Sequence, residues 1–384
     1  MTRRALLPLS ILLLAGTAGA SPPLTLQEAV AVALEQNPAV RSARESADAA
    51  AARAAQARGA RRPRLDLVEA FTWTDQPASV FALTLNQERF DLGGFLEADP
   101  NQPDTLDTWS THLELTLPVY TGGQLTARID QAAAVATAEE SDFWWARELT
   151  AHEVVAAFVE LAKARDSVAL LRTARATTLR HVELARSLAG QGMLLEADVL
   201  KAEVHLAEVE EHLARAESGA ALAEASLNFR LGTDQGTPRQ LAPLPAALEV
   251  DGTLEERLAR ALDRRRDLEA ARARLEAGRL EERVARAGFL PEVAVRGSYD
   301  LFDDTPFGSR GGSATVVAFA RLNLYRGGAD AAALESARSS TRSFEQLLRR
   351  FEDSVRLEVR QAWQELATAR ARQATASRSL AAAG

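Results

Sequence analysis

Five histidines are the residues of this chain best suited to metal binding or acid–base chemistry, since the sequence contains no cysteine. They are scattered along it, at His112, His152, His181, His205 and His212. His205 and His212 lie one heptad apart among glutamates, and a weak metal site is one interpretation. Two helical turns separate them, however, too far for the pair to chelate one ion. We favour a solvated helix face, and predict no metal, no cofactor and no catalytic residue.

Nucleotide and nucleic-acid chemistry also lack their signatures. The segment FGSRGGSA (307–314) has no lysine where a phosphate-binding loop needs one, and it is typical of a hairpin turn. The net charge of −8 provides no basic footprint for nucleic acid. We therefore expect a protein that is not an enzyme, does not bind nucleic acid and takes any energy for its work from a partner.

The first twenty residues have the form of an export signal. Arg3 and Arg4 precede an apolar run, and small residues precede Ser21, where we expect the mature chain to begin. The alternative, a membrane anchor, is disfavoured because the run is too short to span a bilayer. No later run of eighteen apolar residues occurs, so any membrane-embedded part would have to be made of strands.

The chain repeats one unit. Residues 24–67 align without gaps with 252–295, and the motif Tyr-x-Gly-Gly at 120–123 recurs at 325–328. The first copy carries an insertion of 23 residues between its two strand-like segments. We predict two copies, 21–250 and 251–384, each in the order helix, strand, loop, strand, long helix.

The helices of the first copy are long. We expect one over about 26–58, capped by Thr25 with Glu28 in a capping box and broken near Asn37 by Pro38. A second helix, from about 124 to 189, contains no Gly or Pro and would extend about 100 Å. After a tip near 190–195 a further helix carries a near-heptad apolar stripe, which predicts an antiparallel helical hairpin.

Four segments read as strands, at about 63–75, 110–121, 290–303 and 314–326. Apolar Leu113 and Leu115 alternate with His112 and Glu114, as they would in a half-buried sheet or in a membrane barrel. The export signal and the long helices favour the barrel. Four strands cannot close one, so two or three chains would have to contribute. The aromatic residues expected at the membrane interface are Phe71, Trp73 and Tyr299.

Four segments together resemble the TolC-type outer-membrane factors: LTLQEAVAVALEQNPAVRSAR (24–44), SVFALTLNQERFDLGGF (79–95), LPVYTGG (117–123) and GQGMLLEADVLKAE (190–203). The resemblance implies a mainly α fold with β, a homotrimer with a twelve-stranded barrel in the outer membrane of a Gram-negative bacterium, and a helical tunnel in the periplasm. The implied function is a passive duct for efflux or type I secretion. The implied partners are outer-membrane lipid, a periplasmic adaptor and an inner-membrane pump.

The same resemblance assigns candidate site residues. Adaptor contact and tunnel closure fall at the hairpin tip, on Gln191, Gly192, Met193, Leu194 and Asp198. For Asp198 the alternative is a helix-start acid stabilised by the helix dipole. The strand–helix junctions are Tyr120, Gly122, Gly123, Tyr325, Gly327 and Gly328, where paired glycines permit a tight change of backbone angles.

The second copy departs from the family pattern at its end. Gly384 aligns with Leu179 of the first copy, so the second tip and its returning helix have no counterpart. We hypothesise a truncation. The alternatives are a periplasmic coiled-coil adaptor or structural protein, and a non-functional truncated outer-membrane factor.

Overall fold

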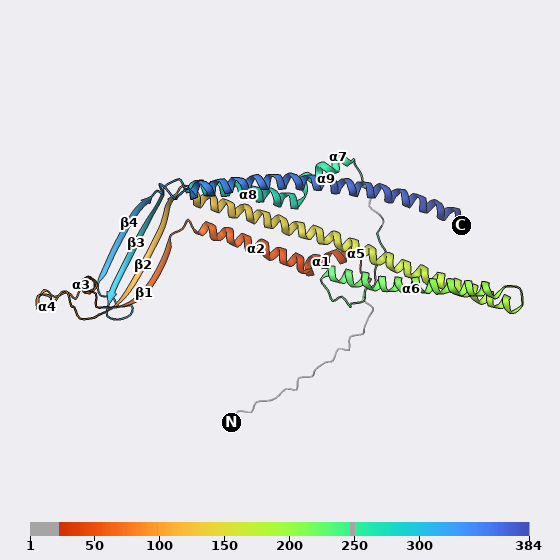
Figure 1. Ribbon diagram of the computed structural model, residues 1–384, viewed down its shortest axis with the longest axis horizontal. Helices are drawn as coiled ribbons and strands as arrows, with labels where there is room; N and C mark the ends of the chain where they lie inside the picture. The colour runs from red at the N-terminus through yellow and green to blue at the C-terminus, as the bar shows by residue number, and fades with distance from the viewer. Residues whose placement is uncertain (1–22, 98, 246–249, 384) are drawn as a thin grey trace, which may run out of the picture. The chain divides into compact units, whose positions relative to one another are not determined.

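A computed structural model describes residues 23–97, 99–245 and 250–383 of the chain. The expected export signal, residues 1–20, lies outside the described residues. The described chain is mainly helical with one four-stranded antiparallel sheet, which confirms the predicted combination of helices and strands (Figure 1). In this part of the chain, no helix is both long and apolar enough to cross a membrane.

The chain divides into two compact units. One unit contains the described residues of 1–41 and 147–249, and the other those of 42–146 and 250–384. The longest helix, α5 (Gln124–Gly190), contributes its first part to the second of these units and the remainder to the first. We refer to them as the hairpin unit and the sheet unit.

The sheet has the order β1-β2-β3-β4. Its strands are β1 (Arg64–Thr74), β2 (Leu106–Thr121), β3 (Glu292–Asp303) and β4 (Gly312–Arg321). Strand β2 begins four residues earlier than expected because residues 106–109 pair with the end of β1. Strand β4 ends five residues earlier because Arg321 is the last residue that pairs with β3.

The two faces of the sheet differ in polarity, as the alternation in the sequence predicted. Leu113 pairs with both Leu67 and Tyr299, which makes one face apolar across three strands. On the other face His112 pairs with Asp300, and Glu114 with Asp66. Because side chains alternate along a strand, this register puts apolar residues on one face and charged residues on the other in these rows of the sheet.

The insertion of the first copy folds as two short helices between β1 and β2, α3 (Pro77–Asn86) and α4 (Leu92–Glu97). The rings of Phe81, Phe90 and Phe95 lie 5.4–5.5 Å apart and form a small apolar cluster. The buried Gln87 donates a hydrogen bond of 2.9 Å to Thr108 and thereby ties the insertion to β2.

Each copy begins with a broken helix. The first is α1 (Leu26–Gln36) followed by α2 (Pro38–Gly59), and the second is α7 (Leu254–Arg264) followed by α8 (Arg266–Ala287). Capping boxes start both, at Thr25 with Glu28 and at Thr253 with Glu256. In the sheet unit, α7 and α8 pack against α9 (Ala329–Ala383).

The hairpin unit pairs α5 with α6 (Glu196–Leu231) (Figure 1). Its apolar core contains the fully buried Phe158, Leu161 and Leu227. Arginines of α5 and glutamates of α6 form a ladder of ion pairs with distances of 2.6–2.8 Å: Arg165–Glu224, Arg172–Glu217, Arg175–Glu210 and Arg186–Glu203. Such exposed pairs contribute little stability individually, but their one-sided arrangement helps to fix the antiparallel register.

Candidate functional site

The hairpin tip is a sharply defined turn. Helix α5 ends in a Schellman motif, in which the Met193 N–H donates to the Leu188 carbonyl and the Gly192 N–H to the Ala189 carbonyl, both at 2.9 Å. Gly192 takes the left-handed conformation, with φ +75°, that this motif requires. Glycine is therefore needed at this position by the backbone itself.

The tip presents apolar side chains to solvent. Met193 is 63% exposed and Leu195 is 72% exposed, while Leu194 is half-buried and Gln191 is exposed. Leu195 was not among the predicted tip residues, although it stands in the same short segment between glycine and helix. Apolar residues gathered at one end of a polar hairpin mark a surface suited to contact with another protein.

Asp198 is satisfied within its own helix. It lies in the first turn of α6 and is half-buried. Its carboxylate accepts a hydrogen bond of 3.0 Å from Lys201, one turn further along. This geometry is what the dipole-stabilised acid would have, and it leaves Met193, Leu194 and Leu195 as the more prominent features of the tip.

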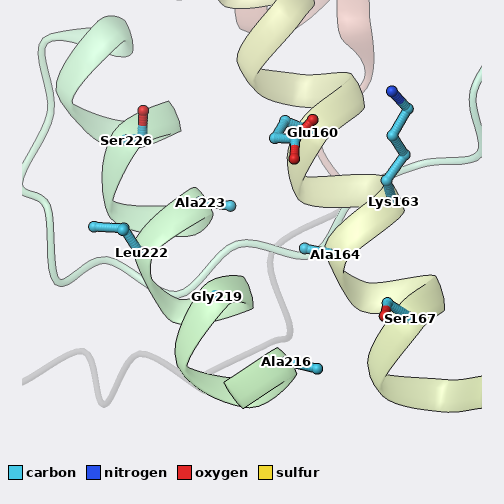
Figure 2. A pocket seen from close by; sticks show the side chains of 9 residues that line it. All are labelled: Glu160, Lys163, Ala164, Ser167, Ala216, Gly219, Leu222, Ala223 and Ser226. Atoms are coloured by element: carbon cyan, nitrogen blue, oxygen red, sulfur yellow. The ribbon is translucent and has the colours of Figure 1, made fainter. Parts of the chain in front are cut away.

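A hollow of about 580 Å³ lies between α5 and α6, well back from the tip (Figure 2). In Figure 2 Ala164 and Ala223 point into the space between the helices, whereas Leu222 points away from it. The lining residues are mostly small: Glu160, Lys163, Ala164, Ser167, Ala216, Gly219, Leu222, Ala223 and Ser226. Small side chains of this kind let another helix approach closely.

At both strand–helix junctions the paired glycines adopt the left-handed backbone conformation. Gly122 and Gly123 have φ of +60° and +81°, and Gly327 and Gly328 have +62° and +84°. At Gly122 there is a second constraint, because a Cβ atom would lie 2.7 Å from the Leu290 Cβ. Tyr120 and Tyr325 precede these turns and are both exposed.

The predicted interface aromatics do not form one cluster. Phe71 packs on Trp109 with ring centroids 5.0 Å apart, and Trp73 follows on the same face of β1. Tyr299 lies further along the sheet, opposite Leu113. Trp109 was missed because the sequence placed the start of β2 after it.

The polar face of the sheet carries a network of charges that the scattered histidines did not suggest. His112 pairs with Asp300 and lies 3.6 Å from Glu114, which in turn lies 3.3 Å from Arg296. Among the residues that the structure describes, no group of three His, Asp or Glu side chains is placed to hold a metal ion. The arrangement provides a charged, partly exposed surface.

Comparisons with known proteins agree with this architecture. Residues 29–233 and 258–384 match the family described as outer membrane efflux protein. Among curated proteins, CyaE of Bordetella pertussis is 30% identical over 224 residues, which cover 57% of this chain and 47% of CyaE. The chain thus spans about half the length of this curated relative.

Solved structures share the fold at low identity. A membrane protein from Pseudomonas aeruginosa has a TM-score of 0.72 at 23% identity, over 90% of this chain and 75% of its own. The Vibrio cholerae outer membrane protein VceC has 0.70 at 20% identity, over 86% and 75%. The Campylobacter jejuni CmeC outer membrane channel has 0.73 at 16% identity, over 86% and 68%.

Proposed function

Because this chain belongs to the outer membrane efflux protein family, we propose that it is one subunit of an oligomeric export channel. Its sheet enters the outer membrane of a Gram-negative bacterium, and its helices stand in the periplasm. It acts as a passive duct without enzymatic activity, within an efflux pump or a type I secretion system. Residues 21–250 and 251–384 supply the two copies of the strand–helix unit.

The observation that carries this proposal is that the sheet has an exposed apolar face and two open edges. Its apolar face is open to solvent, with Leu67 62% exposed and Val316 77% exposed. Strands β1 and β4, of 11 and 10 residues, are its two edges. Unpaired backbone N–H and C=O groups cost several kcal/mol each in lipid, so both edges must be paired when the apolar face is in the membrane.

Closure of the sheet requires further copies of the chain. Single-chain barrels begin at about eight strands, and about twelve strands leave room for a channel. Three copies, each pairing its β1 with a neighbour's β4, supply twelve. The apolar face then meets lipid, with Phe71 and Trp73 toward one interface, while Tyr299 lies in the same row of the sheet as Leu67. The face with His112, Glu114 and Asp300 lines the channel.

The hairpin tip is proposed as the contact with a periplasmic adaptor, through which an inner-membrane pump supplies the energy. Exposure of Met193 and Leu195 on a hydrogen-bonded Schellman turn supports this role. Gln191 and Leu194 belong to the same surface. Asp198, paired with Lys201, keeps the helix start in place. The alternative of a periplasmic adaptor is not favoured, because the two internal repeats of this chain form one sheet. In that sheet β2 of the first repeat pairs directly with β3 of the second.

Cell fractionation tests the proposal. We expect the wild-type protein in the outer membrane and, in mild detergent, as an oligomer. Leu67→Lys places a charge on the lipid face, which costs about 2–4 kcal/mol near the bilayer centre, and should empty the membrane fraction. Val68→Lys introduces the same charge on the opposite face and should not. Recovery of the wild type as a soluble monomer would reject the channel.

A further inference from the structure

A small polar cavity lies in the sheet unit, at the connections that join its strands to its helices. Its volume is about 220 Å³. Three segments meet around it: the end of β2 with the start of α5, the turn from α8 to β3, and the end of β4 with the segment before α9. The lining residues are Thr121, Gln124, Ala287, Gly288, Leu290, Glu292, Arg321, Asn323 and Arg326.

The walls of this cavity are held by close contacts. A Cβ atom on Gly288 would lie 3.1 Å from the Asp330 Oδ1, so the turn after α8 packs tightly on the start of α9. Asp330 accepts a hydrogen bond of 2.8 Å from the Asn323 side chain. The cavity is therefore preorganised by residues on both sides of the α9 start.

The cavity is rich in hydrogen-bond donors. Arg321 pairs with Glu292 at 2.7 Å, and Arg326 pairs with Asp330 at 3.4 Å. Each guanidinium carries five N–H donors, so one carboxylate contact leaves others free for a second acceptor. Asn323, Gln124 and Thr121 add amide and hydroxyl donors. An oxyanion with several acceptor atoms, above all a phosphate, matches two arginines in this setting.

The segment that supplies Asn323 and Arg326 to the cavity also carries exposed apolar residues. The segment between β4 and α9 exposes Leu324 by 87% and Tyr325 by 83%, and Leu322 is also exposed. A water molecule takes about 30 Å³ of the liquid, so the cavity has room for a phosphate ester. Polar donors beside exposed leucine and tyrosine suit a ligand that is charged at one end and apolar at the other.

We propose that this cavity binds the phosphate of a phospholipid headgroup, with the acyl chains lying along Leu322, Leu324 and Tyr325. The proposal rests on the proposed function, which puts the boundary between strands and helices at the membrane surface. Arg321 and Arg326 hold the phosphate oxygens. Glu292, already beside Arg321, can accept an ammonium group of the same headgroup.

The test is a calorimetric titration of the purified full-length protein with two probes, dihexanoyl phosphatidylethanolamine and inorganic phosphate. We expect the lipid to bind at least about tenfold more tightly than phosphate, because only the lipid has acyl chains to bury against Leu322, Leu324 and Tyr325. Arg321→Gln with Arg326→Gln should weaken lipid binding about tenfold or more, through the loss of charge-assisted hydrogen bonds. Arg326→Gln alone, which keeps the Arg321–Glu292 pair, should cause a smaller loss.

Two control variants separate the sources of binding. Arg310→Gln removes an exposed arginine at the other end of β4 and should leave both affinities unchanged. Leu324→Ser should reduce the preference for lipid over phosphate while phosphate binding persists. The proposal is overturned if the double arginine variant binds lipid as well as the wild type does, or if phosphate binds as tightly as lipid.

The outcome can be read separately from that of the channel proposal. All lining residues belong to one chain, so the titration is run on whichever form is recovered, oligomer or monomer. An oligomer from the outer membrane that binds neither probe contradicts the lipid site alone. A soluble monomer contradicts the channel, and its titration still decides whether the cavity takes a phosphate.

Discussion

The two copies contain the same broken helix, and they hold the break in different ways. In each copy an 11-residue helix is followed by one of 22 residues. The break residue is extended in both, with φ −63° and ψ 125° at Asn37, and φ −68° and ψ 126° at Arg265. One backbone conformation is therefore reached from two unrelated residue types.

In the first copy the break is encoded locally. Pro38 restricts the preceding residue to extended conformations. The Asn37 side chain then accepts a hydrogen bond of 2.7 Å from the Ala39 N–H, which caps α2, and donates one of 2.7 Å to the Arg230 carbonyl. Pro38 and Ala39 are sequence neighbours of Asn37, and only the contact with Arg230 is long-range.

In the second copy no proline follows the break, and the tertiary structure holds it. The Arg265 side chain is only 18% exposed and lies over the Trp145 ring, with 4.9 Å to its centroid. It donates to Asp267 at 2.6 Å and to Glu358 at 2.5 Å. Hydrogen bonding to Asp267, with a smaller contribution from Glu358, raises the pKa of Arg265 above its usual value, so it stays charged.

One glutamate at a matching position in each long helix shows the same contrast. Glu153 and Glu358 occupy matching positions after the two Tyr-x-Gly-Gly motifs. Glu153 pairs with Arg230 of α6, whereas Glu358 pairs with the break residue Arg265. A repeated sequence can thus keep its backbone while each copy recruits a different cation, and the break of the second copy depends on distant residues.

The largest expected effect follows from Arg265→Ala. The change removes both ion pairs and leaves Asp267 buried without its cation, which should lower the free energy of opening by about 3 kcal/mol. Hydrogen exchange of α7 and the first turn of α8 measures this as roughly hundredfold less protection. Arg264→Ala, at an exposed neighbour, should change protection little. Equal protection in both variants would contradict a tertiary origin of the break.

Asn37→Ala should have a smaller effect. Loss of the cap on α2 typically costs about 1 kcal/mol, and Pro38 still keeps the chain extended at this position. Hydrogen exchange at the start of α2 should therefore rise several-fold, with Gln36→Ala as the exposed control. A loss as large as that of Arg265→Ala would mean that the first break is not local.

A proline can also be placed at the break of the second copy. Arg266 is the first residue of α8, where proline is well tolerated, and Arg265 is already extended. Arg266→Pro should therefore stabilise the break by about 0.5 kcal/mol and restore part of the protection lost in Arg265→Ala. If Arg266→Pro lowers protection of α8, the two breaks are not interchangeable.

The smallest expected effect is on the capping box of α1. Hydrogen bonds from the Thr25 backbone and hydroxyl lower the pKa of Glu28 from its usual 4.5. The stabilising effect of the Glu28 carboxylate is therefore complete at a pH above its ordinary pKa. The effect is lost as the pH falls through the lower pKa of the folded state. The ratio of amide protection between wild type and Glu28→Gln should shrink from pH 6 to pH 3. A ratio independent of pH would exclude the carboxylate as the source.

Features with a local cause could be predicted from the sequence. The break at Pro38, the capping box at Thr25 and the alternation around Leu113 and Glu114 all depend on near neighbours, and the structure shows each of them. The contacts of Arg265 with Trp145 and Glu358 could not be predicted, because these residues lie far from Arg265 in the sequence. For the same reason the sequence did not reveal the Phe71–Trp109 contact or the cavity beside Arg321.

Within the candidate site, glycine gave the clearest signal. The tip and both junctions depend on backbone conformations that glycine favours, so Gly192 and the paired glycines were identifiable. Surface chemistry was less so. Leu195 is more exposed than Met193, and His112 joins a charge network only because strand pairing brings Asp300 beside it.

The channel proposal requires that, in the membrane, β1 of one protein chain pairs with β4 of a neighbouring chain. The native chain has no cysteine, so Leu67→Cys can be combined in turn with Ala314→Cys, Val316→Cys or Ala318→Cys. Within one chain two strands separate these positions, roughly 14 Å, too far for a disulfide. After oxidation in the outer membrane, we expect at least one pair to give a ladder of cross-linked species that ends at the trimer. When Leu115→Cys, on the inner strand β2, replaces Leu67→Cys in the same combinations, we expect no cross-link. Monomer alone for every pair would contradict the account.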